Sequence, residues 1–155
     1  MSRRMWILTA AALAPVAAVS CASMQKMAPQ EAIDTRQKLM KGQGEAWKAI
    51  QEKTKAGDVA AVVPQAEKLV QSSKEIPKLF PEGSLNPEKS AAKPEIWAKW
   101  PDFEAAAKNL QTQAEKLRDT AKTGDTAATQ QVVSTFGRQA CGTCHTPFRV
   151  PPKQS

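Results

Sequence analysis

Residues 102–124 read DFEAAAKNLQTQAEKLRDTAKTG, and they give the first indication of the fold class. Apolar side chains recur along this stretch at steps of three and four residues, which is the spacing of one face of an α-helix. The stripe consists of Phe103, Ala106, Ala107, Leu110, Ala114, Leu117 and Ala121. We expect Asp102 to cap the amino end of this helix and Gly124 to stop it.

Three further segments of the chain show the same periodicity. Helices are predicted over residues 29–56, over residues 59–75, and from Asp125 or Thr126 to Pro147. Pro64 lies inside the second of these, so we expect a kink there or a late start near Val63. No stretch alternates with a period of two, as a half-buried strand would. The sequence therefore predicts an all-α protein, an antiparallel four-helix bundle.

The connection between the second and third helices, residues 76–101, is rich in proline. Connections of this length are uncommon in compact domains unless they have a function. We expect its larger apolar side chains to hold it down over the end of the bundle. They are Leu79, Phe80, Ile96, Trp97 and Trp100.

The amino terminus has the pattern of an export signal. Arg3 and Arg4 precede the apolar stretch 5–19, which is too short to span about 30 Å of hydrocarbon. We expect residues 1–20 to be a signal peptide and the protein to reside in the bacterial periplasm. Ala18-Val19-Ser20-Cys21 is similar to a lipobox, so a second interpretation is a lipoprotein anchored through Cys21.

The remaining chain divides into a tail over residues 21–28, one helical domain over 29–150 and a tail over 151–155. The whole chain has a formal net charge of +7, but its lysines are spread through all the helices and it contains no tyrosine. Both facts speak against nucleic-acid binding, as does export.

The sequence Cys141-Gly142-Thr143-Cys144-His145 is a C-x-x-C-H motif, which attaches haem c. On an α-helix these three reactive residues stand at i, i+3 and i+4, so they project from one face. Cys141 and Cys144 would then form thioethers to the two vinyl groups, and His145 would bind the iron. The motif predicts one covalently bound haem c per chain.

Other interpretations of the same motif remain open. A thioredoxin-type dithiol begins a helix in a strand-rich fold, which this sequence does not predict. Zinc needs two more ligands, and His145 is the single histidine of the chain. A structural disulfide is compatible with an oxidising compartment. The alternative to a haem protein is therefore an envelope protein with a redox-active or structural C-x-x-C.

Further short motifs accompany C-x-x-C-H in a fixed order. They are Thr35-Arg36-Gln37-Lys38-Leu39-Met40-Lys41, Ile76-Pro77-Lys78-Leu79-Phe80-Pro81, Pro94-Glu95-Ile96-Trp97 and Phe148-Arg149. With the haem motif near the carboxyl end of a four-helix bundle, the chain resembles the class II cytochromes c, the cytochrome c-prime family. It is most similar to the low-spin, methionine-ligated branch of that family.

The resemblance implies roles for particular residues. Met40 would be the second axial iron ligand, opposite the histidine. Arg36 and Gln37 would lie near the haem propionates, and Arg149 on the proximal side. In the high-spin branch the sixth position is open and some members bind NO or CO, which gives the alternative function. In that case Met40 is only a packing residue.

We therefore expect an exported one-electron carrier rather than an enzyme, because no nucleophile–base pair or paired carboxylates occur in the sequence. Its partners would be redox proteins, meeting a haem edge surrounded by Lys38, Lys41, Arg138 and Arg149. The sequence leaves open whether the chain is a monomer or a homodimer.

Overall fold

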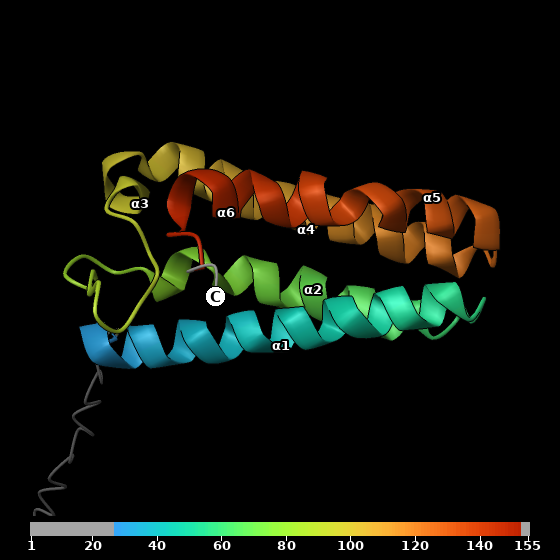
Figure 1. Ribbon diagram of the computed structural model, residues 1–155, viewed down its shortest axis with the longest axis horizontal. Coiled ribbons are helices and arrows are strands. Elements are labelled where there is room, and N and C mark those ends of the chain that lie inside the picture. The colour runs from blue at the N-terminus through green and yellow to red at the C-terminus, as the bar shows by residue number, and fades with distance from the viewer. Residues whose placement is uncertain (1–26, 153–155) are drawn as a thin grey trace, which may run out of the picture.

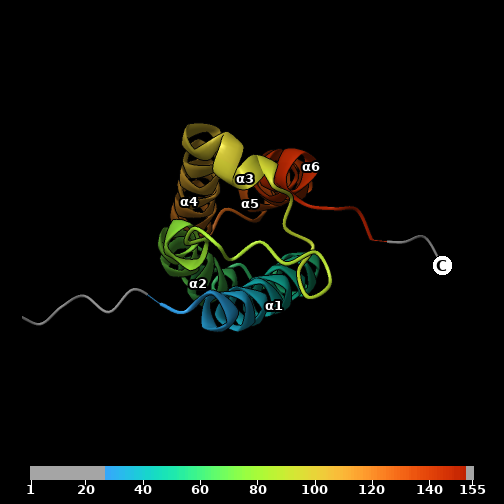
Figure 2. The same ribbon diagram turned by 90° about the vertical axis from the view of Figure 1, so that its left-hand side faces the viewer.

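The computed structural model describes residues 27–152, and the protein is an antiparallel helical bundle there. The bundle consists of α1 (Pro29–Lys55), α2 (Val62–Glu75), α4 (Trp100–Lys122) and α5 (Thr126–Phe136). Figure 1 shows α1 and α2 as one antiparallel pair and α4 and α5 as the other. Viewed along the bundle in Figure 2, the helices follow one another around its axis in chain order. The predicted four-helix bundle is confirmed, and residues 27–152 contain no strand.

The turn between α1 and α2 is formed by a glycine and an aspartate. Gly57 has a φ of 77°, a left-handed conformation that glycine adopts without steric cost. The Asp58 side chain accepts a hydrogen bond from the Ala61 backbone N–H at 3.2 Å. α2 then begins at Val62, so Pro64 lies in its first turn, where a missing N–H has little effect. The predicted late start is confirmed.

The start of α4 differs from the prediction. The helix begins at Trp100 and its N-cap residue is Lys99, so Asp102 is not the cap. Pro101 occupies the first turn, where its fixed φ suits a helix start. Asp102 also lies in the first turn, where the helix dipole favours a negative charge. At the other end of α4, Gly124 has a φ of 76°.

The sequence predicted one continuous last helix, and this prediction is wrong: the helix is divided into three segments. Asp125 caps α5 by accepting a hydrogen bond from the Ala128 N–H at 2.9 Å. After α5 the backbone forms a π-helical segment over Gly137–Gly142 and then α6 (Thr143–Phe148). Pro147 therefore lies inside α6, which ends one residue later. Asn109 of α4 donates to the Gln139 carbonyl oxygen at 2.6 Å, tying the π-helical segment to the bundle.

The connection between α2 and α4 folds over one end of the bundle, as predicted. It contains a 3₁₀ turn at Pro77–Leu79 and the short helix α3 (Glu95–Ala98). Leu79, Phe80 and Ile96 are buried. The indole N–H of Trp97 donates to the Phe80 carbonyl oxygen at 3.0 Å. The connection is therefore a packed part of the domain rather than a loose loop.

An aromatic cluster anchors this end of the molecule. The ring of Phe103 lies 4.8 Å from that of Phe80, 5.4 Å from that of Phe148 and 5.5 Å from that of Trp100, measured between centroids. The cluster joins α4, the connection and α6, and it packs edge to face at Phe80 and Phe148, a favourable aromatic geometry.

Several predictions concern parts of the chain outside the described residues. They are the signal peptide over residues 1–20 and the lipidation of Cys21, and both stay predictions. The domain limits of 29–150 also stay a prediction. Within residues 27–152 no helix is both long enough and apolar enough to cross a membrane.

Candidate functional site

A cavity of about 440 Å³ opens between α1, α6 and the connection. Its apolar walls come from the aromatic cluster and from Ile96. Six of the seven site residues named from the sequence line it: Arg36, Gln37, Met40, Cys144, His145 and Arg149. The volume is within the range of cofactor and ligand sites in proteins. The fold thus brings residues more than a hundred positions apart into one site.

Both cysteines of the motif are half-buried free thiols. Cys144 lines the cavity, whereas Cys141, the seventh predicted residue, packs against the adjoining core. Burial raises the pKa of the Cys141 thiol. Burial, and to a lesser degree Cys141, raise the pKa of Cys144 to about 11. A reactive redox dithiol needs a lowered pKa, so these thiols do not have the electrostatics of a thioredoxin-type site.

His145 lines the cavity from the first turn of α6. Its side chain is partly exposed. Partial burial and the nearby Arg149 lower the pKa of the imidazole, which favours the neutral form that binds a metal. Among the described residues, no three His, Cys, Asp or Glu side chains gather as a metal site of their own.

Arg36 of α1 is almost fully buried, with 3% of its surface exposed. Its guanidinium donates to the Leu79 carbonyl oxygen at 3.3 Å and to both the hydroxyl and the carbonyl oxygen of Ser84, at 2.9 and 2.8 Å. It also donates to the Ser90 hydroxyl at 2.9 Å. None of the ion pairs within residues 27–152 involves Arg36. The cavity wall therefore contains a buried cation whose partners are all neutral.

The two other polar residues predicted at the site lie at the rim of the cavity. Gln37 is exposed and donates to the Lys89 carbonyl oxygen. Arg149 follows α6 in an extended conformation and forms an antiparallel bridge with Ala92. Arg149 therefore lines the same cavity as His145.

Met40 is half-buried and packs against the core. It lines the cavity from α1, one helical turn beyond Arg36, while His145 lines it from α6. Met40 is the one methionine among the lining residues that the structure describes. A thioether and an imidazole on two different helices therefore face the same space.

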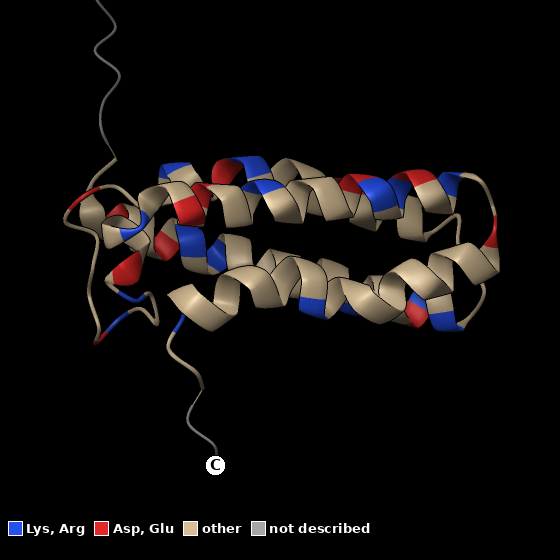
Figure 3. Ribbon diagram, turned by 90° about the horizontal axis from the view of Figure 1, so that it is seen from above, with Lys and Arg blue, Asp and Glu red and all other residues tan. Residues whose placement is uncertain are grey.

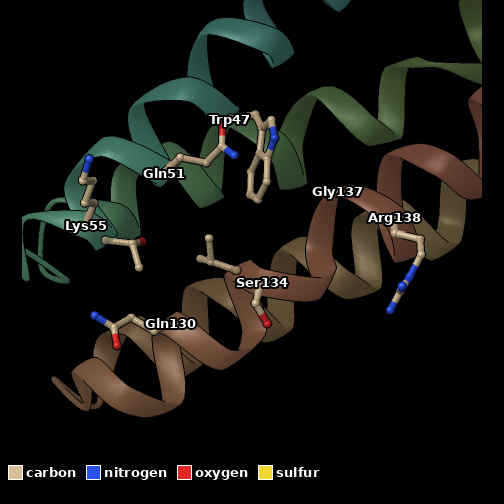
Figure 4. A pocket seen from close by; sticks show the side chains of 9 residues that line it. Trp47, Gln51, Lys55, Gln130, Ser134, Gly137 and Arg138 are labelled. Carbon is tan, nitrogen blue, oxygen red and sulfur yellow. The ribbon is translucent and has the colours of Figure 1, made fainter.

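A second hollow of about 460 Å³ lies farther along the bundle, between α1 and α5. Figure 4 shows Trp47 at one end of it, with Gln51 and Gln130 along its sides. The Trp47 ring stacks on Phe136 with 4.9 Å between centroids. Arg138 lines this hollow, whereas Lys41 and Arg149 line the first cavity; the group of cations around the haem edge stays a prediction.

The structure also adds residues that the sequence did not single out. Ser84 and Ser90 hold Arg36, and Ser90 lines the cavity. Serine in a loop has no distinctive spacing, so no sequence pattern marks these two. The length of the connection was the signal that this segment had a function.

Comparison with known proteins identifies the family. The family model described as cytochrome c' matches residues 31–149. The chain belongs to the cytochrome c' family. Cytochrome c' of Pararhodospirillum photometricum is 30% identical over 124 residues, which cover 78% of this chain and 98% of that protein. Cytochrome c-556 of Rhodopseudomonas palustris is 33% identical over 132 residues, covering 79% and 85%.

Solved structures support the same fold. Cytochrome c' from Rubrivivax gelatinosus superposes with a TM-score of 0.70 at 26% identity, covering 83% of this chain and all of that one. A nitric oxide complex of a cytochrome c' variant from Alcaligenes xylosoxidans superposes with a TM-score of 0.70 at 23% identity, covering 79% and 97%.

Cytochromes c' bind haem c covalently, and the cavity of this family member fits that cofactor. The family haem motif lies beside apolar walls, and the buried Arg36 offers a positive charge that has no acidic partner among residues 27–152. The cofactor of this chain is therefore haem c. The interpretation of the motif as a haem-free C-x-x-C is wrong.

Proposed function

We propose that this cytochrome is an exported one-electron carrier with a six-coordinate, low-spin haem. Cys141 and Cys144 would hold the haem as thioethers, and His145 and Met40 would be the residues that bind its iron. The observation that carries the proposal is that Met40 and His145 line one cavity from opposite elements, α1 and α6. Family membership supports the coarser statement, a haem c protein of an electron-carrying and gas-binding family.

When bound, haem c supplies one-electron chemistry between its ferric and ferrous states. The protein residues set the conditions for that change. A thioether ligand favours the reduced state, and apolar walls such as Phe80 and Ile96 disfavour the additional ferric charge. Ligands held by two helices of one folded domain would keep their positions in both oxidation states, so little rearrangement would accompany electron transfer.

Arg36 and Gln37 have a binding role in this proposal. A buried guanidinium with only neutral partners stabilises an anionic group placed beside it. The propionates are the anionic groups of haem, so we assign Arg36 as their main charge partner. Gln37 and Arg149 are exposed residues at the rim, where they would adjoin the bound haem.

The partner of the carrier is a redox protein that docks briefly at the rim of the cavity. The helical stretch from Thr126 to Phe148 contains a single charged residue, Arg138. In Figure 3, α5 and α6 are accordingly almost entirely tan, the colour of residues other than Lys, Arg, Asp and Glu. The cations at the rim are Lys41 of α1 and Arg149. A small charged rim beside a weakly charged helix suits a transient complex. We expect no catalytic turnover and a periplasmic location.

The second candidate is a high-spin haem that binds NO or CO. Two observations favour it: one of the relatives is itself named cytochrome c', and the Alcaligenes xylosoxidans neighbour is a nitric oxide complex. In this function Met40 would be a packing residue of the cavity wall and would not bind the iron.

Optical spectra of the purified cytochrome separate the two functions. The oxidised and reduced proteins are recorded with and without carbon monoxide. Bands that stay unchanged on the time scale of mixing support the six-coordinate carrier. A rapid, large shift of the reduced bands contradicts it and supports the gas-binding function.

A further inference from the structure

The π-helical segment Gly137–Gly142 overlaps the first two residues of the haem motif, Cys141 and Gly142. In an α-helix each carbonyl oxygen accepts a hydrogen bond from the N–H four residues farther on, and in a π-helix from the N–H five residues farther on. The π-helical winding is rare and occurs mostly as single turns. Its presence here therefore calls for contacts that favour it over α-helical winding.

The contacts that favour the π-helical winding converge on the carbonyl oxygen of Gln139. The side-chain amide of Asn109, on α4, donates to this oxygen at 2.6 Å, and the Thr143 hydroxyl donates to it at 3.2 Å. Side chains that bond to a helix carbonyl oxygen compete with the backbone N–H that an α-helix would use. For Gln139 that N–H belongs to Thr143, so the two side chains favour the wider winding.

Asn109 holds both ends of this arrangement from a fixed position. Its amide also donates to the Thr143 hydroxyl, at 3.1 Å. Its neighbours Ala106 and Leu110 are buried in the core, which fixes the backbone of α4 at this point. Among residues 27–152, Asn109 is the one residue outside the segment 137–148 whose side chain donates to a residue of the haem motif.

We propose that Asn109 is the positioning residue of the haem motif: its bonds to Gln139 and Thr143 set the direction in which the motif presents His145 to the cavity. Thr143 and His145 both belong to the short helix α6, so a change of winding before Thr143 turns both side chains. The inference rests on the proposed function of His145 as an iron ligand. It does not depend on Met40 and holds for the low-spin and the high-spin haem alike.

Asn109→Leu tests the positioning in the haem-loaded protein. Leucine is similar in size to asparagine and a better helix former, but it cannot donate a hydrogen bond. Gln113→Leu is the matched control. Gln113 is likewise half-buried, one turn farther along α4, and the side-chain hydrogen bonds from α4 to the π-helical segment come from Asn109.

A second pair of variants changes the motif side of the same contact. Thr143→Val removes the hydroxyl at nearly constant volume, and Thr143→Ser retains it. This pair tests the inference even if Asn109→Leu fails to fold, because Thr143 is exposed and contributes nothing to the core.

Nuclear magnetic resonance spectra of the oxidised holoprotein give the readout at the haem, since the haem methyl signals depend on the orientation of the axial imidazole. We expect Asn109→Leu and Thr143→Val to shift these signals or to add a second set with about a tenth or more of the intensity. Gln113→Leu and Thr143→Ser should keep the wild-type signals. Wild-type signals in Asn109→Leu or Thr143→Val, or equal changes in Gln113→Leu, overturn the inference.

Amide hydrogen exchange separates positioning from ordinary stabilisation. In the π-helical winding the Gln139 carbonyl oxygen is the partner of the Cys144 N–H. This N–H should exchange about tenfold faster in Asn109→Leu than in Gln113→Leu, because the winding is loosened. Faster exchange with unchanged haem methyl signals would mean that Asn109 only stabilises the segment, and it overturns the inference.

His145→Ala distinguishes a failure of the inference from a failure of the proposed function. If His145 binds the iron, this variant changes the optical spectrum and the haem methyl signals. A changed spectrum in His145→Ala together with wild-type signals in Asn109→Leu overturns the inference alone. A wild-type spectrum in His145→Ala overturns the proposed function, and the inference with it.

Discussion

The guanidinium carbon of Arg36 lies 4.6 Å from the centroid of the Phe80 ring, so a cation of α1 rests on an aromatic side chain of the connection. Such a contact stabilises by a cation–π interaction, more strongly when it is buried. The same guanidinium holds Ser84 and Ser90. Arg36 therefore links three parts of the site: the first helix, the aromatic cluster and the connection that covers the cavity.

Arg36→Leu should destabilise the protein strongly. The substitution leaves the carbonyl oxygens of Leu79 and Ser84 without their donor, and we expect a loss of about 3 kcal/mol in the free energy of unfolding. Denaturant unfolding of the holoprotein measures it. Lys38→Leu, an equal charge change at an exposed position of the same helix, is the control and should stay within about 0.5 kcal/mol of the wild type. Equal losses in the two variants would refute the role of Arg36.

Met40→Ala tests the sixth iron ligand. If Met40 binds the iron, its removal opens a coordination position, changes the optical spectrum and allows rapid carbon monoxide binding. The reduction potential should fall, because the thioether favours the reduced state. Met27→Ala is the matched control, since Met27 packs against the core and does not line the cavity. A Met40→Ala spectrum identical to the wild type would show that Met40 is only a packing residue.

The double substitution Cys141→Ala with Cys144→Ala tests the attachment of the haem. Expressed with haem-attachment machinery, the wild-type chain should carry the mass of one haem after denaturation, and the double variant should have the mass of its amino acids alone. Cys21→Ser removes the third cysteine and should leave the haem in place. Mass spectrometry under denaturing conditions decides between these outcomes.

A surface ion-pair group should give the protein a measurable pH dependence. Arg118 donates to Glu67 of α2 at 2.9 Å and to Asp119 at 2.8 Å. Hydrogen bonds from Arg118 lower the pKa of both carboxyls from their ordinary values of 4.5 and 3.8. A carboxyl whose pKa is lower in the folded than in the unfolded state stabilises the fold at pH values above its unfolded-state pKa. This stabilisation is lost as the pH falls through the folded-state pKa.

Arg118→Gln should therefore lower the thermal midpoint at pH 7 and make no difference in strong acid, below both lowered pKa values. Lys116→Gln changes the same charge at an exposed position of the same helix and is the control. It should not show a difference in thermal midpoint at pH 7 that disappears in strong acid. A pH-independent difference between Arg118→Gln and the wild type would mean that lost packing, rather than the ion pairs, causes the effect.

Local patterns were enough to predict the helices. The three-and-four spacing of Phe103, Leu110 and Leu117 places them on the buried face of α4, as predicted. The glycine and aspartate signals located two of the turns. The start of α4 was misplaced because aspartate favours both the cap and the first turn, and only the position of Pro101 distinguishes them.

The residues of the site that belong to a sequence motif could be predicted. Those that depend on contacts between distant parts of the chain could not. The C-x-x-C-H spacing identified the haem motif directly. The burial of Arg36, by contrast, depends on a loop more than forty residues away, and an arginine on a helix is usually solvated. Local periodicity likewise gave no sign of the π-helical segment before the motif.

That π-helical segment has a consequence for the evolution of the site. A π turn is an α-helix with one residue inserted, and each residue turns an α-helix by about 100°. Deleting one residue between Gly137 and Cys141 would restore regular winding, leave the pentapeptide intact and swing it about 100° around the axis of α5. Such a chain would keep the C-x-x-C-H motif, while its cysteines and histidine faced a different neighbour. An insertion or deletion between Gly137 and Cys141 would therefore redirect the haem motif without altering its sequence.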